Sequence, residues 1–308
     1  MNIVLSSKVD YFTSEQYARL QKLEADFDVH IFVQTGKAPL SCPIGNIDYL
    51  IHTDIFSKHD LDEFKQLKQL QILSAGTDRL DMPRLKEKKI VVANASDVYS
   101  VPIAEFVLMR ILEIYKSARY FEQIQQNRNT LKKRDLVELF GKTCAIYGYG
   151  SIGREIAVRL KSFGVKTIGI SRSGKKDEYI EEGLPLSQSE GHISEYDIVV
   201  SCLPQTEETE EFFNDNYFSA MKENSVFVNI SRGAVVDEEA LISATKSGKL
   251  LGVALDVFVT EPLPDDSELW SLENVYLSPH NSFASTIMYD RLFDRIYDNL
   301  VKYLEENR

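Results

Sequence analysis

Short apolar runs separated by polar stretches dominate the first third of the chain. The runs are four or five residues long, as expected for strands that are buried on both faces of a parallel sheet. They lie at residues 2–5, 29–33, 48–52, 70–74 and 90–93. Between them, residues 13–25 and 60–69 repeat apolar positions at helical spacing. This alternation predicts an α/β unit with helices on the faces of its sheet.

A long helix is predicted to follow, from about Val101 to Gln126. Ser100 can cap this helix, and Pro102 suits its first turn. Its apolar residues cover more than one face, so the helix has to be covered either by the core of the same chain or by a second subunit. The sequence leaves both interpretations open.

A second series of apolar runs starts after Lys142 and predicts a second parallel sheet. Its candidate strands are residues 143–147, 165–170, 197–203, 225–230, 251–257 and 274–278. Helical periodicity intervenes at 152–163 and at 237–247, where Gly248 takes the position after the helix. An amphipathic helix is predicted over 284–306. The predicted fold class is therefore α/β, with two doubly wound parallel-sheet domains.

Composition restricts the class of protein further. The chain has 308 residues, of which 44% are hydrophobic, so it is long enough for two domains with buried cores. Its net charge of −12 argues against a nucleic-acid or membrane-surface partner. We expect a cytoplasmic protein, because no apolar stretch resembles a signal-peptide core or a membrane span. Cys42, Cys144 and Cys202 are widely spaced in apolar contexts, which predicts reduced core cysteines and no metal site.

A glycine-rich loop lies between the candidate strand 143–147 and the helix that follows it. The loop has the pattern G-x-G-x-x-G and consists of Gly148, Tyr149, Gly150, Ser151, Ile152 and Gly153. Such glycines permit a tight turn and close approach of the backbone to a pyrophosphate, which the N–H groups of the helix can then bind. Ordinary turns also contain this pattern, but the strand–turn–helix context favours a dinucleotide site.

The residues at the end of the next strand discriminate between the two nicotinamide dinucleotides. An NAD site places an Asp or Glu there to bind the ribose 2′-hydroxyl. This chain has Ser171, Arg172 and Ser173, followed by a glycine and two lysines. These hydroxyls and cations suit a 2′-phosphate, although a solvated basic loop would have the same composition. NADP(H) is therefore favoured over NAD(H).

Three further polar groups follow later strands of the second sheet. Arg232, Glu261 and His280 offer a cation, a carboxylate and an imidazole. Arginine can hold a substrate carboxylate through two parallel hydrogen bonds, and histidine can protonate a carbonyl oxygen while a carboxylate stabilises the imidazolium. Structural roles are the alternative. Arg232 could cap a helix or pair with Asp237, Glu261 could bracket the turn at Pro262, and the histidine could belong to a loop.

Taken together, these segments resemble the D-isomer-specific 2-hydroxyacid dehydrogenase family, which includes glyoxylate/hydroxypyruvate reductases and phosphoglycerate dehydrogenases. Besides the glycine loop, the resemblance rests on residues 74–78, 229–241, 254–264 and 269–280, and it covers nearly the whole chain. It implies a flavodoxin-like substrate domain formed by residues 1–98 and 284–308. It further implies a Rossmann dinucleotide-binding domain formed by residues 99–283, through which two copies make a homodimer.

The resemblance also implies a role for each motif residue. Arg232 would orient the substrate carboxylate, His280 would be the acid/base, and Glu261 would stabilise its protonated form. Backbone N–H groups of Ala75 and Gly76 would bind the same carboxylate. Asp256 would contact the carboxamide of the nicotinamide. Further cofactor contacts are implied at Cys202, Leu203, Pro204, Thr209 and Ile230.

The reaction implied is the NAD(P)H-dependent reduction of a small 2-oxo acid to the D-2-hydroxy acid. A formate dehydrogenase shares the architecture but pairs its histidine with glutamine, so Glu261 argues against it. A short phosphoglycerate dehydrogenase stays open, as does a corepressor-like protein that senses dinucleotides and binds peptides. Asn281, Ser282 and Phe283 replace the small residues that many members carry, and the sequence does not name the 2-oxo acid.

Overall fold

The computed structural model describes residues 1–7, 9–36 and 38–308. The chain divides into two compact units. The first comprises Met1–Tyr99 together with Ser285–Arg308, and the second comprises Ser100–Ala284. Within the described residues, no helix combines the length and the apolar character needed to cross a membrane.

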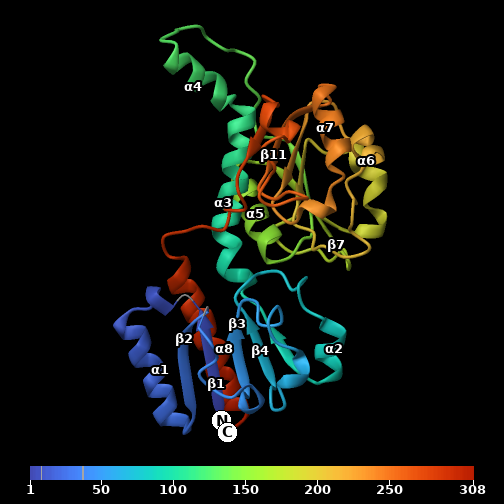
Figure 1. Cartoon of the computed structure of the whole chain (residues 1–308). Helices are drawn as coiled ribbons and strands as arrows, with labels where there is room; N and C mark the ends of the chain where they lie inside the picture. Colours follow the sequence, from blue (N-terminus) through green and yellow to red (C-terminus); the bar gives the residue numbers. More distant parts are fainter. Residues whose placement is uncertain (8, 37) are drawn as a thin grey trace. The chain divides into compact units, whose positions relative to one another are not determined.

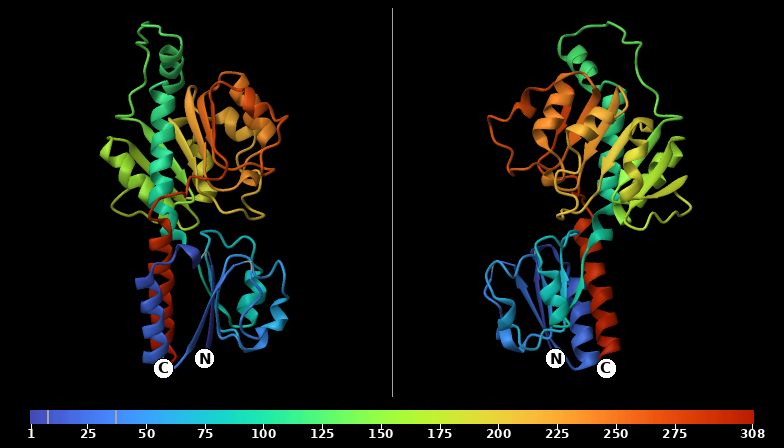
Figure 2. Two further views of the ribbon diagram at one scale, coloured as in Figure 1. Left: turned by 60° about the vertical axis from the view of Figure 1, so that its left-hand side comes forward. Right: turned by 90° about the vertical axis from the view of Figure 1, so that its right-hand side faces the viewer.

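The first unit is built on a parallel sheet with strand order β2-β1-β3-β4-β5 (Figure 1). Its strands in the described part of the chain are β1 (Asn2–Ser7), β2 (His30–Thr35), β3 (Tyr49–His52), β4 (Gln69–Ile72) and β5 (Val91–Ala93). Helices α1 (Ser14–Phe27) and α8 (Met288–Glu306) lie side by side (Figure 2). All of the strands expected here are confirmed, to within two residues at each end.

Two hydrophobic clusters cover opposite faces of this sheet, because successive side chains of a strand point to opposite sides. Ile3 and Leu5 pack in the cluster that contains α1 and α8, whereas Val4 between them belongs to the other cluster. On α8, Phe293 and Ile296 are completely buried in the first cluster. Burial of such side chains stabilises the unit by about 1.5–3 kcal/mol each. The C-terminal helix therefore completes the first unit.

The prediction of a helix over residues 60–69 is wrong. Only a single 3-10 turn, Leu61–Glu63, forms there, and the chain then runs irregularly to β4. Leu61, Phe64 and Leu67 are all buried. Their spacing of three residues therefore reflects burial of an irregular segment and not a helical face.

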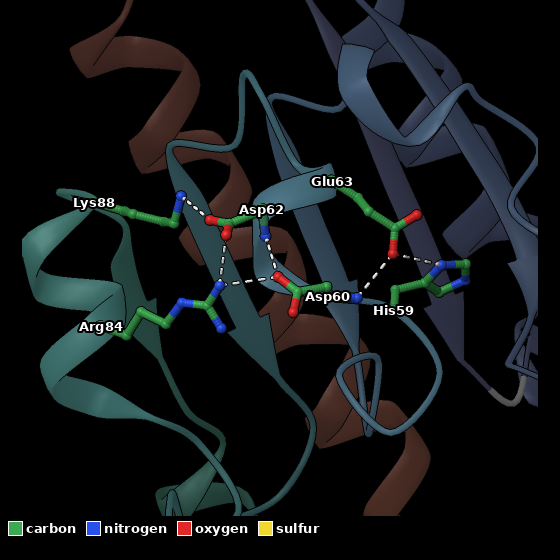
Figure 3. Close-up of polar contacts among 6 residues, drawn as sticks. All are labelled: His59, Asp60, Asp62, Glu63, Arg84 and Lys88. Carbon is green, nitrogen blue, oxygen red and sulfur yellow. Dashed lines mark hydrogen bonds and ion pairs between the residues drawn. The ribbon is translucent and has the colours of Figure 1, made fainter.

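Polar contacts tie this segment to helix α2 (Met82–Glu87), which the apolar pattern did not predict (Figure 3). The carboxylate of Asp60 caps the 3-10 turn by accepting the N–H of Asp62 at 2.7 Å. The guanidinium of Arg84 donates to Asp60 at 2.9 Å and to Asp62 at 2.8 Å. The ammonium of Lys88 lies 2.5 Å from Asp62. Each exposed pair contributes little alone, but the group links two segments that are distant in sequence.

The second unit is built on a larger parallel sheet with strand order β12-β11-β10-β9-β6-β7-β8. Its strands in the described residues are β6 (Thr143–Tyr147), β7 (Lys166–Ser171), β8 (Glu182–Pro185), β9 (Ile198–Ser201), β10 (Ser225–Asn229), β11 (Leu250–Leu255) and β12 (Val275–Leu277). Its helices include α5 (Ser151–Ser162), α6 (Asp215–Ala220) and α7 (Glu238–Lys246). The six expected strands are confirmed, and with them the predicted fold class of two parallel-sheet α/β domains. Strand β8 was not predicted because it lacks an apolar run and ends in a proline, which an edge strand tolerates.

The long helix expected over 101–126 is in fact two helices. Helix α3 (Ser96–Tyr115) begins five residues earlier, so Ser100 is a buried helical residue and not a cap. For the same reason Pro102 lies inside the helix and not in its first turn. At Ser117 the backbone turns left-handed, with φ +50°, and α4 (Ala118–Gln126) follows.

The two helices differ in how they are covered. Ile103, Val107 and Ile111 of α3 are buried. A Cβ on Gly252 in β11 would lie only 2.6 Å from the side chain of Ile114, so this helix packs closely on the sheet. The core interpretation is therefore confirmed for α3. By contrast, none of the residues of α4, all of which the structure describes, is buried.

Candidate active site

The candidate residues of the second unit lie along one edge of its sheet, where the C-terminal ends of the parallel strands meet. The glycine loop follows β6, and Arg232 follows β10. Glu261 comes after β11 and His280 after β12. Because β10, β11 and β12 are neighbours in the sheet, the loops that follow them are neighbours as well.

The glycine loop brings the end of β6 against the loop that follows β9. Gly148 has φ +84°, and a Cβ there would lie 2.5 Å from the carbonyl carbon of Cys202 and 2.8 Å from the nitrogen of Leu203. A Cβ on Gly153 would lie 3.0 Å from a side-chain carbon of Ile146, so α5 packs closely on β6. A Cβ on Gly150, by contrast, would meet only a carbonyl oxygen at 3.9 Å. The middle glycine therefore borders open space.

The first turn of α5 offers N–H groups that are suited to phosphate. The helix begins at Ser151 after a glycine, which has no side chain to cap it. Within the described residues, no group accepts a hydrogen bond from the N–H of Ser151, Ile152 or Gly153. Three N–H groups and the positive end of the helix dipole therefore lie at the open space of the loop. These features fit the pyrophosphate of a dinucleotide.

The basic segment after β7 is held in place by close backbone contacts. Arg172 and Ser173 are exposed, and no described side chain forms an ion pair with Arg172. Gly174 has φ +60°, and a Cβ on it would lie 2.6 Å from the ring of Pro185 in β8. A Cβ on Gly183 would likewise lie 2.8 Å from the nitrogen of Lys176. The segment is thus folded against the edge strand, with the guanidinium of Arg172 in solvent.

The next carboxylate in the sequence, Asp177, is engaged within the protein. It accepts the hydroxyl of Tyr149 at 2.8 Å and the N–H of Tyr179 at 2.9 Å, and Nε of Arg154 lies 3.6 Å away. Burial, together with the bond to Asp177, raises the pKa of Tyr149. Tyr149, the second residue of the glycine loop, therefore holds the carboxylate of Asp177 after the basic segment. The sequence pattern did not indicate this contact.

The loop after β9 is shaped by buried groups. Thr209 is buried, and its hydroxyl donates to the carbonyl of Pro204 at 2.6 Å while accepting the N–H of Thr206 at 2.9 Å. Leu203 and Ile230 are also buried. Their predicted contact with a cofactor stays a prediction, and what the structure assigns to Thr209 is closure of the 204–209 turn.

The three cysteines are free. Burial raises the pKa of the Cys202 thiol to about 12, so it stays protonated. Burial also raises the pKa of Cys42 and of Cys144. In the described part of the chain, no group of three or more His, Cys, Asp or Glu side chains is arranged to hold a metal ion.

The loop that carries Arg232 is anchored on both sides. Asn229, the last residue of β10, bonds to the backbone of Ser231 and Arg232. Arg232 is half-buried, and its Nη1 donates to the carbonyl of Ser231 at 2.6 Å. A Cβ on Gly233 would overlap the backbone of Phe258, so only glycine lets this loop lie against the segment that leads to Glu261.

Glu261 and His280 form a hydrogen-bonded pair. Oε1 of Glu261 accepts the N–H of Phe258 at 3.2 Å, and Oε2 lies 2.9 Å from Nδ1 of His280. Both side chains are exposed. Assigned from this hydrogen bond, Nδ1 carries a proton toward the carboxylate, and Nε2 is the nitrogen left to exchange a proton with a ligand. The ring of Phe283 lies edge-on, with its centroid 6.5 Å from that of His280.

The contact expected between Asp256 and the carboxamide of a nicotinamide stays a prediction. Asp256 is completely buried in the structure. Its carboxylate accepts three hydrogen bonds from the loop 278–282, on which His280 lies. Two of these donors are the N–H groups of Asn281 and Ser282, which stand where many members of the family carry small residues.

In the first unit, the loop after β4 holds the predicted N–H groups of Ala75 and Gly76. The amide of Asn94 donates to the carbonyl of Ala75 at 2.9 Å, and the hydroxyl of Ser74 donates to the carbonyl of Gly76 at 3.0 Å. No described residue accepts a hydrogen bond from the N–H of Ala75 or Gly76. Thr77 and Asn94 help to line a cavity of about 420 Å³ beside this loop. The loop is thus fixed through its carbonyls, and its N–H groups are left for a ligand.

Sequence reasoning missed the polar residues that hold these loops. Asn94 follows β5 and Asn229 ends β10, yet neither resembles a reactive group by itself. Their position at the C-terminal end of a predicted strand is the signal that could have found them. Asn229 is buried and Asn94 is half-buried. Amides withdrawn from water are hydrogen-bonded, and the partners in reach are the backbone groups of the adjacent loops.

Comparison with known proteins identifies the family of the chain. A family model described as D-isomer specific 2-hydroxyacid dehydrogenase, NAD binding domain, matches residues 108–282. Glyoxylate reductase of Pyrococcus furiosus is 30% identical over 298 residues, which cover 92% of this chain and 88% of that protein.

Solved structures agree as well. A D-isomer specific 2-hydroxyacid dehydrogenase family protein from Aeromonas salmonicida has a TM-score of 0.81 at 28% identity, covering 99% of this chain and 96% of that one. An NADPH-dependent glyoxylate/hydroxypyruvate reductase from Sinorhizobium meliloti, in complex with NADP and sulfate, has a TM-score of 0.79 at 25% identity, covering 99% and 95%. The chain therefore belongs to the D-isomer specific 2-hydroxyacid dehydrogenase family and is an NAD(P)-dependent 2-hydroxyacid oxidoreductase.

Proposed function

We propose that the protein reduces a small 2-oxo acid to the D-2-hydroxy acid with NADPH. In this proposal residues 1–98 and 284–308 form the substrate domain, and residues 99–283 form the dinucleotide domain. The observation that carries it is the pair of Glu261 and His280, in which the carboxylate is itself held by a backbone N–H. A histidine held in this way through Nδ1 presents Nε2 as an acid.

Each side chain has a defined task in this proposal. Arg232 binds the substrate carboxylate through two parallel hydrogen bonds and so orients the carbonyl carbon. His280 donates the proton on Nε2 to the carbonyl oxygen as negative charge develops there. Glu261 stabilises the positive charge of the ring before the proton leaves. When bound at the glycine loop, the dinucleotide supplies the hydride. In the first unit, the N–H groups of Ala75 and Gly76 bind a substrate carboxylate.

Steady-state kinetics of two variants test this assignment. His280→Ala should lower kcat by a hundredfold or more, because general acid catalysis contributes on the order of 10²–10⁴. Its affinity for the dinucleotide should stay within twofold of that of the wild type. Arg232→Lys loses the two-pronged geometry and should raise the KM for the 2-oxo acid. A fully active His280→Ala enzyme would overturn the proposal. Dinucleotide binding without any turnover in the wild type would favour the corepressor-like protein that senses dinucleotides.

The preference for NADPH is proposed from the segment that follows β7. Ser171, Arg172 and Ser173 present two hydroxyls and an exposed guanidinium, whereas the carboxylate of Asp177 is engaged by the hydroxyl of Tyr149. A 2′-phosphate would therefore meet donors and no free carboxylate at the start of this segment. The related reductase from Sinorhizobium meliloti was solved with NADP.

Arg172→Ala tests this preference. It should raise the KM for NADPH about tenfold or more, since hydrogen bonds to charged groups contribute about 1.5–3 kcal/mol. The KM for NADH should change less than twofold. Lys22→Ala is the control, because Lys22 is an exposed cation of α1 in the first unit. Equal losses with both dinucleotides would contradict the proposal.

We also propose a homodimer formed through the second unit. Helix α4 and the segment after it project from the rest of that unit (Figures 1 and 2). Phe121, Leu131 and Phe140 in this region are 42%, 66% and 77% exposed. Exposed apolar side chains in a projecting region suit an interface between subunits. Sedimentation equilibrium should give twice the mass of the chain, and Phe121→Glu combined with Leu131→Glu should halve it. A monomeric wild type would contradict the proposal.

A further inference from the structure

The glycine loop is hydrogen-bonded to the end of β7, directly before the basic segment that begins at Ser171. The carbonyl of Ile170 accepts the N–H of Gly148 at 2.8 Å and that of Tyr149 at 2.9 Å. A Cβ on Gly169 would lie 2.8 Å from Cγ of Tyr149, so the tyrosine ring packs on β7 at a position without a side chain. The backbone and the ring of Tyr149 thus join the glycine loop to the strand that leads into the basic segment.

The hydroxyl of Tyr149 extends this connection to the far end of the basic segment. It donates to Oδ1 of Asp177 at 2.8 Å, and the same oxygen accepts the N–H of Tyr179 at 2.9 Å. Burial and the bond to Asp177 raise the pKa of Tyr149, so the hydroxyl stays protonated and is the donor. Asp177 directly follows Lys176, the last cation of the basic segment. One carboxylate oxygen therefore connects the glycine loop to the end of that segment.

Helix α5, which follows the glycine loop, holds the same end of the segment. Nε of Arg154 lies 3.6 Å from Oδ2 of Asp177, and its guanidinium carbon lies 4.6 Å from the ring centroid of Tyr179. Nζ of Lys161 donates to the carbonyl of Glu178 at 2.8 Å. Residues 177–179 are therefore fastened both to the glycine loop and to the helix whose first turn offers N–H groups to a phosphate.

The cations between these attachments are left exposed. Arg172, Lys175 and Lys176 all lie in solvent, whereas Gly174 between them lies against β8. A backbone that is fixed at both ends presents such cations in a restricted region, so a ligand has less conformational freedom to remove when it binds. If the attachment at Asp177 is lost, the ligand itself has to order the segment.

We propose that Tyr149 and Asp177 are positioning residues for the 2′-phosphate of NADPH, because their hydrogen bond holds the basic segment against the glycine loop. This inference rests on the proposed function, since it takes the basic segment as the 2′-phosphate site. Its effect has the opposite sign to that of simple electrostatics. Removal of a carboxylate near a phosphate strengthens binding by reducing repulsion, whereas removal of an attachment weakens it.

Dissociation constants of NADPH and NADH, measured by fluorescence titration without a 2-oxo acid, test the inference. Tyr149→Phe removes the hydroxyl but keeps the ring on β7, and Asp177→Ala removes its acceptor. Each should raise the Kd of NADPH about fivefold or more and leave that of NADH within about twofold, because the lost bond involves a charged group that holds only the basic segment. The double variant should bind NADPH no more weakly than the weaker single variant, because both substitutions remove the same bond.

A conservative variant and two matched controls complete the series. Asp177→Asn keeps an oxygen for the hydroxyl of Tyr149, so it should retain the NADPH affinity that Asp177→Ala loses. Tyr196→Phe removes a buried hydroxyl that has no partner in the described part of the chain and that precedes β9, at the opposite edge of the sheet. Asp294→Ala removes the same charge from α8 in the first unit, where Asp294 pairs with Arg19 at 2.8 Å. Both controls should keep the wild-type ratio of the two dissociation constants.

Two cofactor fragments isolate the contribution of the 2′-phosphate. In isothermal titration calorimetry, adenosine 2′,5′-bisphosphate should lose affinity in Tyr149→Phe and Asp177→Ala, whereas adenosine 5′-phosphate should bind as it does to the wild type. Tighter binding of NADPH by Asp177→Ala would overturn the inference, because the carboxylate would then act only by repulsion. Equal losses with both dinucleotides would also overturn it, because the bond would then support the whole site and not the 2′-phosphate.

The outcomes also distinguish this inference from the proposed function. If Asp177→Ala does not fold, Tyr149→Phe decides the test alone, and a wild-type ratio of dissociation constants in that variant overturns the inference. If the wild type binds NADPH no more tightly than NADH, the proposed preference fails and the inference fails with it. If Arg172→Ala loses the preference but Tyr149→Phe and Asp177→Ala behave like the controls, the proposed preference stands and the inference alone fails.

Discussion

Replacement of Gly148 by alanine tests whether the glycine loop is built for close approach of the backbone. The residue has φ +84°, and an added Cβ would lie 2.5 Å from the carbonyl carbon of Cys202. An ordinary contact is about 3.4 Å or more, so the two backbones would have to separate by about 1 Å. The atoms that the Cβ would meet belong to the main chain of Cys202 and Leu203, and main-chain atoms cannot turn aside as a flexible side chain could.

Two effects lower the stability of Gly148→Ala, and the same substitution at Gly248 isolates one of them. The left-handed backbone costs a residue with a Cβ about 1–2 kcal/mol. The overlap with Cys202 adds about 1–3 kcal/mol, as is typical of overpacking. Gly248 has φ +78° with nothing within 4 Å of an added Cβ. Gly248→Ala should therefore show the first cost alone.

Urea unfolding and dinucleotide titration measure the two consequences. Gly148→Ala should lose about 1–3 kcal/mol more of the free energy of unfolding than Gly248→Ala. It should also lose tenfold or more in affinity for the dinucleotide, because the turn that presents the N–H groups of α5 is displaced. Gly248→Ala should bind the dinucleotide like the wild type. Equal stability and equal affinity in the two variants would refute the reasoning.

Three further predictions concern single side chains. Burial raises the pKa of Cys202 to about 12, so iodoacetamide at pH 8 should leave it unmodified until urea unfolds the protein, and rapid alkylation would contradict this. Burial of Asp197 acts to raise its pKa, but the bonds from Lys222 and from the N–H of Thr143, together with the charges of Lys222 and Lys142, outweigh it, so the pKa is lowered overall. Its stabilisation is therefore present above about pH 4 and lost as pH falls further, so the gap in unfolding free energy between wild type and Asp197→Asn should shrink toward pH 3, and a constant gap would refute this. Glu261→Gln keeps the bond from Phe258 but removes the charge beside His280, so kcat should fall about tenfold or more in initial-rate assays, and an unchanged kcat would argue against that role.

The strands were predictable because burial on both faces leaves an unbroken apolar run in the sequence. The apolar run at residues 143–147, for example, has the same bounds as strand β6. The helix prediction over residues 60–69 was wrong because Leu61, Phe64 and Leu67 are buried at helical spacing without a helix. There, capping by Asp60 and its contact with Arg84 decide the conformation, and such tertiary contacts leave no periodic pattern in the sequence.

The reactive groups of the site were also predictable, because each follows a strand and has an unmistakable chemistry. What holds them was not predictable. Asp256 is buried and accepts three hydrogen bonds from N–H and O–H donors of the loop that carries His280, and its position after a strand did not indicate these partners. Asn229 was not singled out at all. In both cases the function depends on partners that are distant in sequence.

The most direct test of the account is the initial rate of NADPH oxidation with a panel of 2-oxo acids, with NADH in parallel and His280→Ala as the control. The panel comprises glyoxylate, hydroxypyruvate, pyruvate, phenylpyruvate and a branched aliphatic 2-oxo acid. We expect turnover of at least one of these acids, faster with NADPH than with NADH, and lost in His280→Ala. Turnover that persists in His280→Ala, or no turnover of any acid by a wild-type protein that binds the dinucleotide, would contradict it.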